Sequence, residues 1–399
     1  MILKAYKRIR NSFEDWILYY LLILIIAGIS SFAVQMIATG LPLYCIDIGK
    51  TTAESGIMAG FYTIALIIAR SFVGKLTDER GKWNIAIIGM LLMIASIAGM
   101  SFFRKLIFFN MYQLLEGLSF SALSTAIAAL LLDILPPMAT VKGIALFTVT
   151  KSLTISIGAS VAVSFAEKFG SEKIFIFTFF LSVVAFVLLF FLRKAEVTNS
   201  KIVTSNNNNI KNDNKGINKY IYVSALPICL IQFVFTFSLT LGTCYLPAYA
   251  QSIGLAGVGI YYTISAITMF ASRTIFAKIL DRINTKVSFI IGMLLAAITT
   301  IGILLSSNLL YFALLSIPNA IGICMINPML NVKATGNVPV DRRGVASSTY
   351  YASLDLGSGA GSMIWGILVP IIGYKTSFIT ATLLLVLVTF YGIHKVIKE

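Results

Sequence analysis

Three ionisable side chains lie deep inside long apolar stretches of this sequence: Glu116, Lys151 and Asp355. An ionisable group far from water is costly and normally faces a cavity or a partner. A carboxyl group in a low-dielectric cavity holds a proton more readily than one in water. Glu116 and Asp355 could therefore take up and release a proton as their surroundings change. Lys151 could bind an acid or an anionic molecule.

Each of these side chains also has a purely structural interpretation. Glu116 and Lys151 could form an ion pair between adjacent helices, and Asp355 could bind nearby hydroxyls such as that of Ser358. If Lys151 keeps Glu116 charged, Asp355 is the better proton carrier. If that pair breaks during a cycle, Glu116 is the better carrier. The sequence leaves both choices open.

Other polar residues recur at helical spacing and mark faces that could line a shared cavity. The candidate cavity residues are Gln35, Gln113, Glu116, Lys151, Gln232, Asn319, Asn327, Tyr351 and Asp355. Ser31 and Ser124 lie on the same faces as Gln35 and Gln113. For each residue the alternative is a hydrogen bond that joins two helices.

The elements that carry these residues are apolar runs. The 399-residue chain is 58% hydrophobic and 12% charged, whereas a soluble domain is about half apolar and a quarter charged. The excess lies in runs long enough to cross a bilayer as helices. We identify twelve: 17–40, 53–73, 84–103, 106–132, 143–166, 173–192, 220–247, 255–276, 286–306, 309–333, 345–369 and 374–394. The prediction is an all-α polytopic membrane protein with twelve transmembrane helices.

The net charge of +15 follows from topology and does not indicate a nucleic-acid partner. Of the 31 Lys and Arg residues, Lys151 alone lies deep in a run. Only six lie in the loops on one side of the membrane: Lys50, Arg104, Lys105, Lys168, Lys173 and Lys375. The others lie on the opposite side, and basic residues stay in the cytoplasm during insertion. Both termini are therefore predicted to be cytoplasmic.

A charged hairpin between two apolar runs occurs twice. In each copy an Arg ends the first run and an Asp follows eight residues later, as in Arg70 with Asp78 and Arg273 with Asp281. The repeat predicts two six-helix domains, residues 1–194 and 219–399. The segment 195–218 has no apolar periodicity and is predicted to be a cytoplasmic linker. A second repeat supports this division: Leu41-Pro42-x-Tyr44 recurs as Leu246-Pro247-x-Tyr249.

The first hairpin contains Gly74-Lys75-Leu76-Thr77-Asp78-Glu79-Arg80-Gly81-Lys82. This stretch resembles the G-x-L-x-D-x-x-G-[RK] loop of the major facilitator superfamily, and the resemblance extends over nearly the whole chain. It implies two pseudo-symmetric bundles around a central cavity. It also implies a cytoplasmic gate formed by Arg70, Gly74, Asp78, Arg80, Gly81, Lys82, Arg273 and Asp281.

The chain departs from the exporters of that family in two places. Many of them carry an R-x-x-Q-G pattern in the fourth helix, where this chain has Gln113-Leu114-Leu115-Glu116-Gly117. A role in proton coupling assigned to that Arg cannot be transferred to Gln113. The fifth helix keeps Gly158 but lacks the proline that usually follows. The stretch 348–357 is a better match to the family, because it resembles bacterial efflux members of the superfamily.

The resemblance and the buried charges together predict a monomeric exporter in the inner membrane of a bacterium. Its partners are the lipid bilayer, protons taken up in exchange, and a small organic molecule, as in multidrug efflux. Lys151 favours a carboxylate, so a specific anionic or zwitterionic metabolite, such as an amino-acid derivative or a metallophore, is the alternative. An uptake symporter is a third option. No cofactor or metal site is predicted, and no His pair, G-x-S-x-G or phosphate-binding loop indicates an enzyme.

Overall fold

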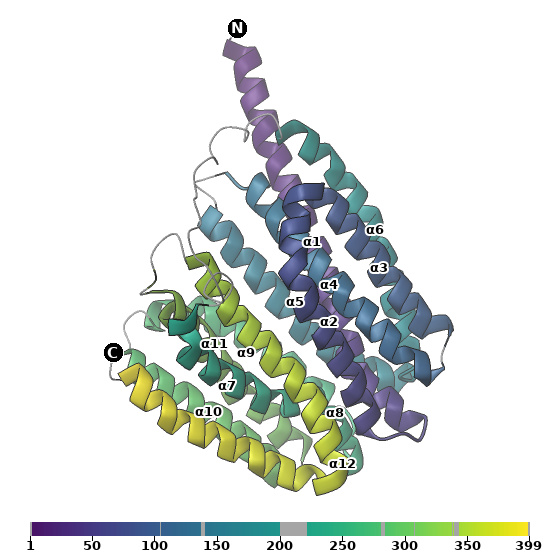
Figure 1. Ribbon diagram of the computed structural model, residues 1–399, viewed down its shortest axis with the longest axis vertical. Coiled ribbons are helices and arrows are strands. Elements are labelled where there is room, and N and C mark those ends of the chain that lie inside the picture. Colours follow the sequence, from purple (N-terminus) through teal and green to yellow (C-terminus); the bar gives the residue numbers. More distant parts are fainter. Residues whose placement is uncertain are drawn as a thin grey trace. The chain divides into compact units, whose positions relative to one another are not determined.

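A computed structural model describes residues 2–103, 105–136, 140–199, 222–280, 284–306, 308–336, 338 and 343–397. Within these ranges every regular element is a helix (Figure 1). The elements are α1 (Ile2–Asp47), α2 (Thr52–Arg80), α3 (Lys82–Phe102), α4 (Leu106–Ile134), α5 (Thr140–Phe169), α6 (Lys173–Asn199), the short 3-10 helix η2 (Val223–Ala225), α7 (Leu226–Cys244), α8 (Leu246–Ser252), α9 (Gly259–Leu280), α10 (Thr285–Leu305), α11 (Leu309–Gly336) and α12 (Arg343–Ile397).

Ten helices in the described part of the chain are long and apolar enough to cross a membrane. The longest, α12, changes direction at Gly373, whose φ of 78° and ψ of 161° are not helical. This break lies between the predicted segments 345–369 and 374–394. α9 covers most of the predicted segment 255–276. The helices are therefore consistent with twelve transmembrane segments.

Many large apolar side chains point away from the protein. Ile107 is 77% exposed, Leu305 79% and Phe390 68%. Apolar exposure of this extent is unfavourable in water but not in lipid, where helices satisfy their backbone hydrogen bonds internally. The chain is a multi-pass membrane protein, as its composition predicts.

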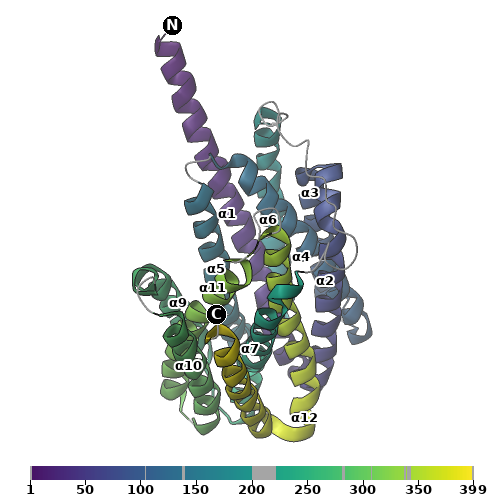
Figure 2. The same ribbon diagram turned by 60° about the vertical axis from the view of Figure 1, so that its left-hand side comes forward.

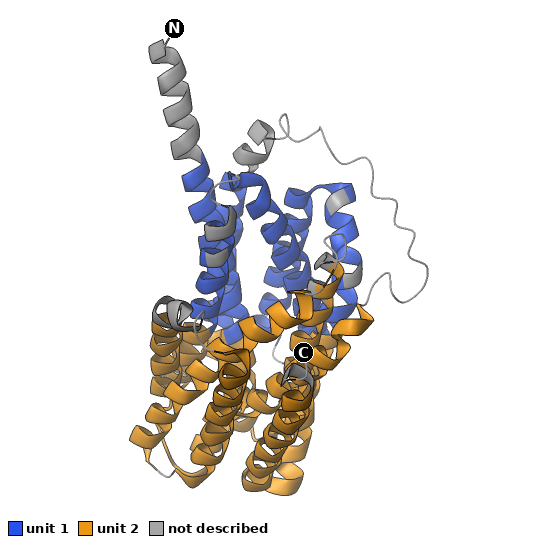
Figure 3. Ribbon diagram, turned by 90° about the vertical axis from the view of Figure 1, so that its left-hand side faces the viewer, with its two compact units in different colours: residues 1–35, 65–155, 175–211 blue, residues 36–64, 156–174, 212–399 orange. Residues whose placement is uncertain are grey.

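The helices form two compact units (Figure 3). Unit 1 contains residues 1–35, 65–155 and 175–211, and unit 2 contains residues 36–64, 156–174 and 212–399. Unit 2 thus includes short parts of α1, α2 and α5 and the first two residues of α6, together with the second half of the chain. The predicted division at a linker, 195–218, follows the sequence and remains a prediction, since 200–221 lie outside the described residues.

Glycines allow the close helix pairs in both units. In unit 1, Gly99 of α3 lies against the ring of Tyr112 in α4. In unit 2, a Cβ atom at Gly302 of α10 would lie 2.5 Å from Leu315 of α11; α10 and α11 run side by side (Figure 2). The two contacts have the same sequence spacing, so α10 and α11 repeat α3 and α4 in register. In this register Asn319 corresponds to Glu116.

The ends of α2 and α5 that belong to unit 2 pack closely on helices from the second half of the chain. A Cβ atom at Gly56 of α2 would lie 2.9 Å from the Cα atom of Gly366 in α12. Ser160 of α5 donates a hydrogen bond of 2.8 Å to the carbonyl of Gly259 in α9. Near the same end of α5, the Gly257 N–H donates to Glu167 Oε1 over 2.7 Å. These contacts explain why unit 2 includes residues from the first half.

The repeated Leu-Pro-x-Tyr segment has two different structures. α1 continues through Pro42 to Asp47. In the second copy, α7 ends at Cys244 and α8 begins at Leu246 with Pro247 in its first turn. Proline fits a first helical turn, where its missing N–H is not needed.

Candidate functional site

Among the predicted acids whose side chains the structure describes, Glu116 is the most deeply buried. It lies on α4 and is 1% exposed. Gln113, one turn earlier, donates a hydrogen bond of 2.7 Å from Nε2 to Glu116 Oε2. The same Nε2 lies 3.7 Å from the sulfur of Met100 in α3. Glu116 Oε1 is buried and has no hydrogen-bond partner among the described residues. A carboxyl group placed in this way can accept a proton on Oε1.

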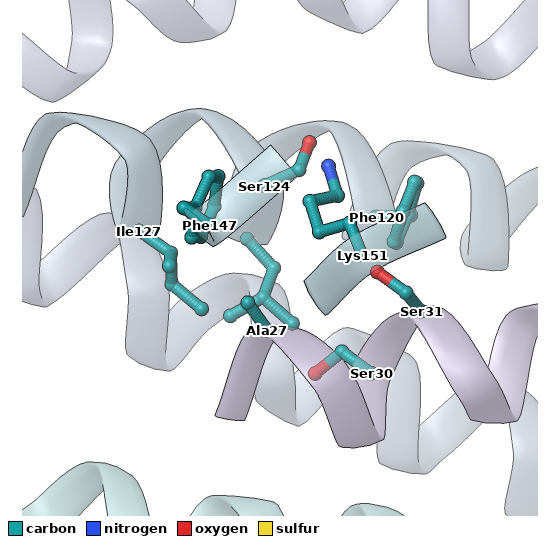
Figure 4. A pocket seen from close by; sticks show the side chains of 9 residues that line it. Ala27, Ser30, Ser31, Phe120, Ser124, Ile127, Phe147 and Lys151 are labelled. Carbon is teal, nitrogen blue, oxygen red and sulfur yellow. The ribbon is translucent and has the colours of Figure 1, made fainter. Parts of the chain in front are cut away.

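Lys151 lies on α5 and projects into a crevice of unit 1 (Figure 4). The crevice is lined by α1, α4 and α5 through Ala27, Ser30, Ser31, Phe120, Leu123, Ser124, Ile127, Phe147 and Lys151. The Lys151 Nζ atom lies 5.7 Å from the ring centroids of both Phe120 and Phe147. These are cation–π distances, so the rings stabilise the ammonium group in largely apolar surroundings.

The ion pair considered between Glu116 and Lys151 is not among the ion pairs of the described residues. Glu116 is held by Gln113 near α3, whereas Lys151 reaches α4 one turn further along, at Phe120. The structure therefore gives each its own surroundings.

In unit 2 the predicted residues Gln232 and Asn327 form a neutral network with Tyr350. Gln232 of α7 is 1% exposed, and its Nε2 donates to Asn327 Oδ1 of α11 over 3.1 Å. The Tyr350 hydroxyl of α12 lies 2.9 Å from Gln232 Oε1 and 2.7 Å from the Asn327 carbonyl oxygen. Three helices are joined by these bonds, which is the structural alternative considered for Gln232 and Asn327.

The other predicted cavity residues are dispersed over both units. Asn319 of α11 is 8% exposed, and its Oδ1 has no hydrogen-bond partner in the described part of the chain. Tyr351 is 46% exposed, and its hydroxyl accepts a hydrogen bond of 3.3 Å from Asn331. Gln35 on α1 and Asp355 on α12 are both half-buried.

The first hairpin is compact. α2 ends at Arg80, Gly81 has a φ of 89°, and α3 begins at Lys82. This positive φ explains the glycine, because other residues rarely adopt it. Lys82 Nζ donates to both carboxylate oxygens of Asp133, at the end of α4, over 2.6 Å.

The remaining gate residues divide into two groups. Arg70 and Arg80 are exposed, and Gly74 has no neighbour that a Cβ atom would meet. The side chains of Asp78 and Arg273, and all of Asp281, lie outside the described residues. The predicted docking of Asp78 therefore remains a prediction.

Several residues of these sites were not singled out from the sequence. Phe120, Phe147 and Ser30 surround Lys151. Phe120 precedes Ser124 by one turn, Phe147 precedes Lys151 by one turn, and Ser30 directly precedes Ser31. Asp133 could have been found as an acid that ends an apolar run. The described residues contain no group of three or more His, Cys, Asp or Glu side chains that could hold a metal ion.

The helical architecture agrees with comparisons to known proteins. The family model of the Major Facilitator Superfamily matches residues 23–256 and 228–396. The chain therefore belongs to this superfamily of transporters. Its structure is similar to the nucleoside transporter NupG, with a TM-score of 0.73 and 13% identity over 93% of this chain and 97% of that one.

Two relatives are similar in sequence over almost their whole length. An uncharacterized MFS-type transporter of Methanocaldococcus jannaschii is 23% identical over 92% of this chain and 94% of its own. The staphylopine export protein of Staphylococcus aureus is 22% identical over 89% of this chain and 90% of its own. The predicted family and fold class are confirmed.

Proposed function

We propose that this transporter exports a small organic molecule in exchange for protons and that Glu116 is the proton-binding group. The observation that carries the proposal is the surroundings of its carboxyl: one oxygen is bound by Gln113, and the other is buried with no partner in the described residues. Such a group is stable when protonated and costly when charged. It would release its proton only when a conformational change brings water to it.

Asp355 is the second candidate for proton binding. It lies half-buried on α12, in unit 2. We prefer Glu116 because it is the more deeply buried, and because it has its own hydrogen-bond donor in Gln113. Among the described residues no lysine forms an ion pair with Glu116, which also favours this assignment.

Export is supported by the similarity to a protein named for staphylopine export. The close contacts of α2 with α12 and of α5 with α9 fit a state that is closed on the outer side. In this proposal the hairpin with Asp78 controls the cytoplasmic side, both termini are cytoplasmic, and a monomer works in the inner membrane of a bacterium.

The test uses inverted membrane vesicles whose lumen is acidified by ATP hydrolysis. Compounds are first selected by comparing cells that express the transporter with cells that lack it. The comparison covers the metabolites that the cells release and the drugs that they tolerate. A selected compound added to the vesicles should cause proton outflow from the lumen. Glu116→Gln should abolish this outflow, whereas Glu116→Asp, which keeps the carboxyl, should retain part of it.

Membrane abundance of each variant provides the control. Normal outflow in Glu116→Gln would exclude Glu116 as the carrier, and the same assay of Asp355→Asn would then identify the alternative. Further acidification of the lumen on adding the compound would indicate symport and would overturn the proposed direction of coupling.

A further inference from the structure

We infer that Ser160 and Glu167 of α5 form a releasable latch on the α9 start (residues 257–263), which holds one end of the transporter closed between openings. This inference rests on the conformational change that the proposed function requires, but it is independent of the substrate and of the direction of transport. It identifies the contacts that must break when this end opens. All of these residues belong to unit 2.

The inner part of the latch is a buried hydroxyl group. Ser160 is 7% exposed and donates a hydrogen bond of 2.8 Å to the carbonyl oxygen of Gly259, the first residue of α9. Its Oγ atom also lies 2.5 Å from Thr263 Oγ1, one turn further along α9. The helices can approach because Gly259 has no side chain: a Cβ atom there would lie 3.0 Å from the Ser160 carbonyl oxygen. A single hydroxyl of α5 thus joins two groups of α9.

The outer part of the latch is a carboxylate at the surface. Glu167 is exposed, and its Oε1 accepts a hydrogen bond of 2.7 Å from the Gly257 N–H. Gly257 has a φ of 80°, which favours glycine and directs the N–H of this turn. Glu167 follows Ser160 by seven residues, or two helical turns, so both side chains lie on the same face of α5. Together they bind the turn before α9 and the first turn of the helix.

The neighbouring contacts indicate which bonds break. The turn after α5 is tied to the first half of the chain, because the Ser171 hydroxyl donates to the Asp47 carboxylate at the end of α1. Movement of the two halves at this end would therefore separate α5 from the α9 start and leave α1 and α5 together. Parting the latch costs little, since water replaces each hydrogen bond that is lost. The contact of α2 with α12 differs, because Gly56 and Gly366 meet there through their backbones.

The test measures how fast the native cysteines react with a maleimide in lipid nanodiscs, where both faces of the protein are accessible. Cys45 and Cys244 lie at the ends of α1 and α7, at the same end of the molecule as the latch, and both are free thiols. Peptide mass spectrometry assigns the reaction to each cysteine. Both should react about tenfold faster in Ser160→Ala, which loses a buried hydrogen bond. The increase should be about threefold in Glu167→Ala, because water weakens a contact at the surface.

Two controls show whether the effect is local. Ser152→Ala should leave the rates unchanged, because the Ser152 hydroxyl donates to the Thr148 carbonyl of its own helix over 3.0 Å. Cys229, near the opposite end of α7, should not react faster in any variant. Unchanged rates in both latch variants would overturn the inference. An equal increase at Cys229 would mean that the whole fold has loosened, and it would also overturn the inference.

A second variant closes the latch permanently. Ser160→Cys combined with Thr263→Cys places two thiols where the hydroxyl oxygens are 2.5 Å apart, which is close enough for a disulfide after oxidation with copper phenanthroline. Oxidation should stop proton outflow in the vesicle assay and slow the reaction of Cys45, and a reductant should restore both. Outflow that continues with the disulfide formed would show that these contacts need not open. If no compound causes outflow even from the wild type, the proposed export fails, whereas the cysteine rates still decide whether the latch exists.

Discussion

At corresponding positions of the two halves, α4 carries Glu116 and α11 carries Asn319. The surrounding packing is alike, because Gly99 meets Tyr112 in one half as Gly302 meets Leu315 in the other. Both side chains are buried, and each has one oxygen with no hydrogen-bond partner in the described part of the chain. The backbone thus provides the same burial twice, but only Glu116 can change its charge.

The polar side chains near these two positions also differ in charge. Unit 1 contains the ionisable Glu116, which is bound by the Gln113 amide, and Lys151, whose ammonium group lies over two aromatic rings. Unit 2 contains the neutral network of Gln232, Asn327 and Tyr350, whose members bind one another. Under the proposed function, Glu116 of unit 1 would exchange the proton, whereas the network of unit 2 would join α7, α11 and α12.

The largest effect on stability is expected for Asn319→Asp, which makes unit 2 resemble unit 1. A second buried carboxylate should destabilise the protein by about 3 kcal/mol when charged. The loss should be smaller at low pH, because a protonated carboxyl carries no charge to desolvate. Thermal unfolding in detergent at two pH values measures this. Asn319→Ser is the neutral control, and equal losses at both pH values would show that water reaches the site.

A smaller effect is expected when alanine replaces the paired glycines. A methyl group at Gly99 meets the rigid ring of Tyr112, whereas one at Gly302 meets the flexible end of Leu315. Gly99→Ala should therefore cost about 2 kcal/mol of unfolding free energy, and Gly302→Ala should cost less. Denaturation of both variants under the same conditions provides the measurement. The reverse order would show that α10 and α11 are packed more rigidly than α3 and α4.

The smallest effect is expected for Tyr350→Phe, which removes one hydroxyl from the unit 2 network. The buried Gln232 Oε1 loses its donor, so the free energy of unfolding should fall by about 1 kcal/mol. Transport of the selected compound should continue at a normal rate with a normal pH dependence. A changed pH dependence in the vesicle assay would mean that the neutral network participates in coupling.

The sequence predicts the fold well because hydropathy along a chain is a local property. Runs of apolar residues mark helices, and the break at Gly373 lies where two predicted runs meet. Likewise, the glycine pattern of the hairpin predicts the turn at Gly81. The two different structures of the Leu-Pro-x-Tyr repeat were not predicted, because identical residues can continue or begin a helix according to their neighbours.

The candidate site was harder to predict. The depth of a residue in the membrane follows from its distance to the helix ends, and this placed Glu116 and Lys151 at similar levels. Which neighbour each meets depends on how the helices are rotated, and the sequence does not specify rotation. Gln113 was found as a polar neighbour of Glu116 but not as its hydrogen-bond donor, and the rings around Lys151 were not distinguished from ordinary packing.

The contact between Gly56 and Gly366 sets a size limit where α2 meets α12. A Cβ atom at Gly56 would lie 2.9 Å from the Cα atom of Gly366, and one at Gly366 would lie 2.6 Å from the Cα atom of Gly56. Neighbouring contacts of the same two helices use the side chains of Met363 and Thr63, which lie against Gly60 and Gly359. In the proposed transport cycle, a larger residue at either glycine would hold the two helices apart and disfavour the state in which they touch.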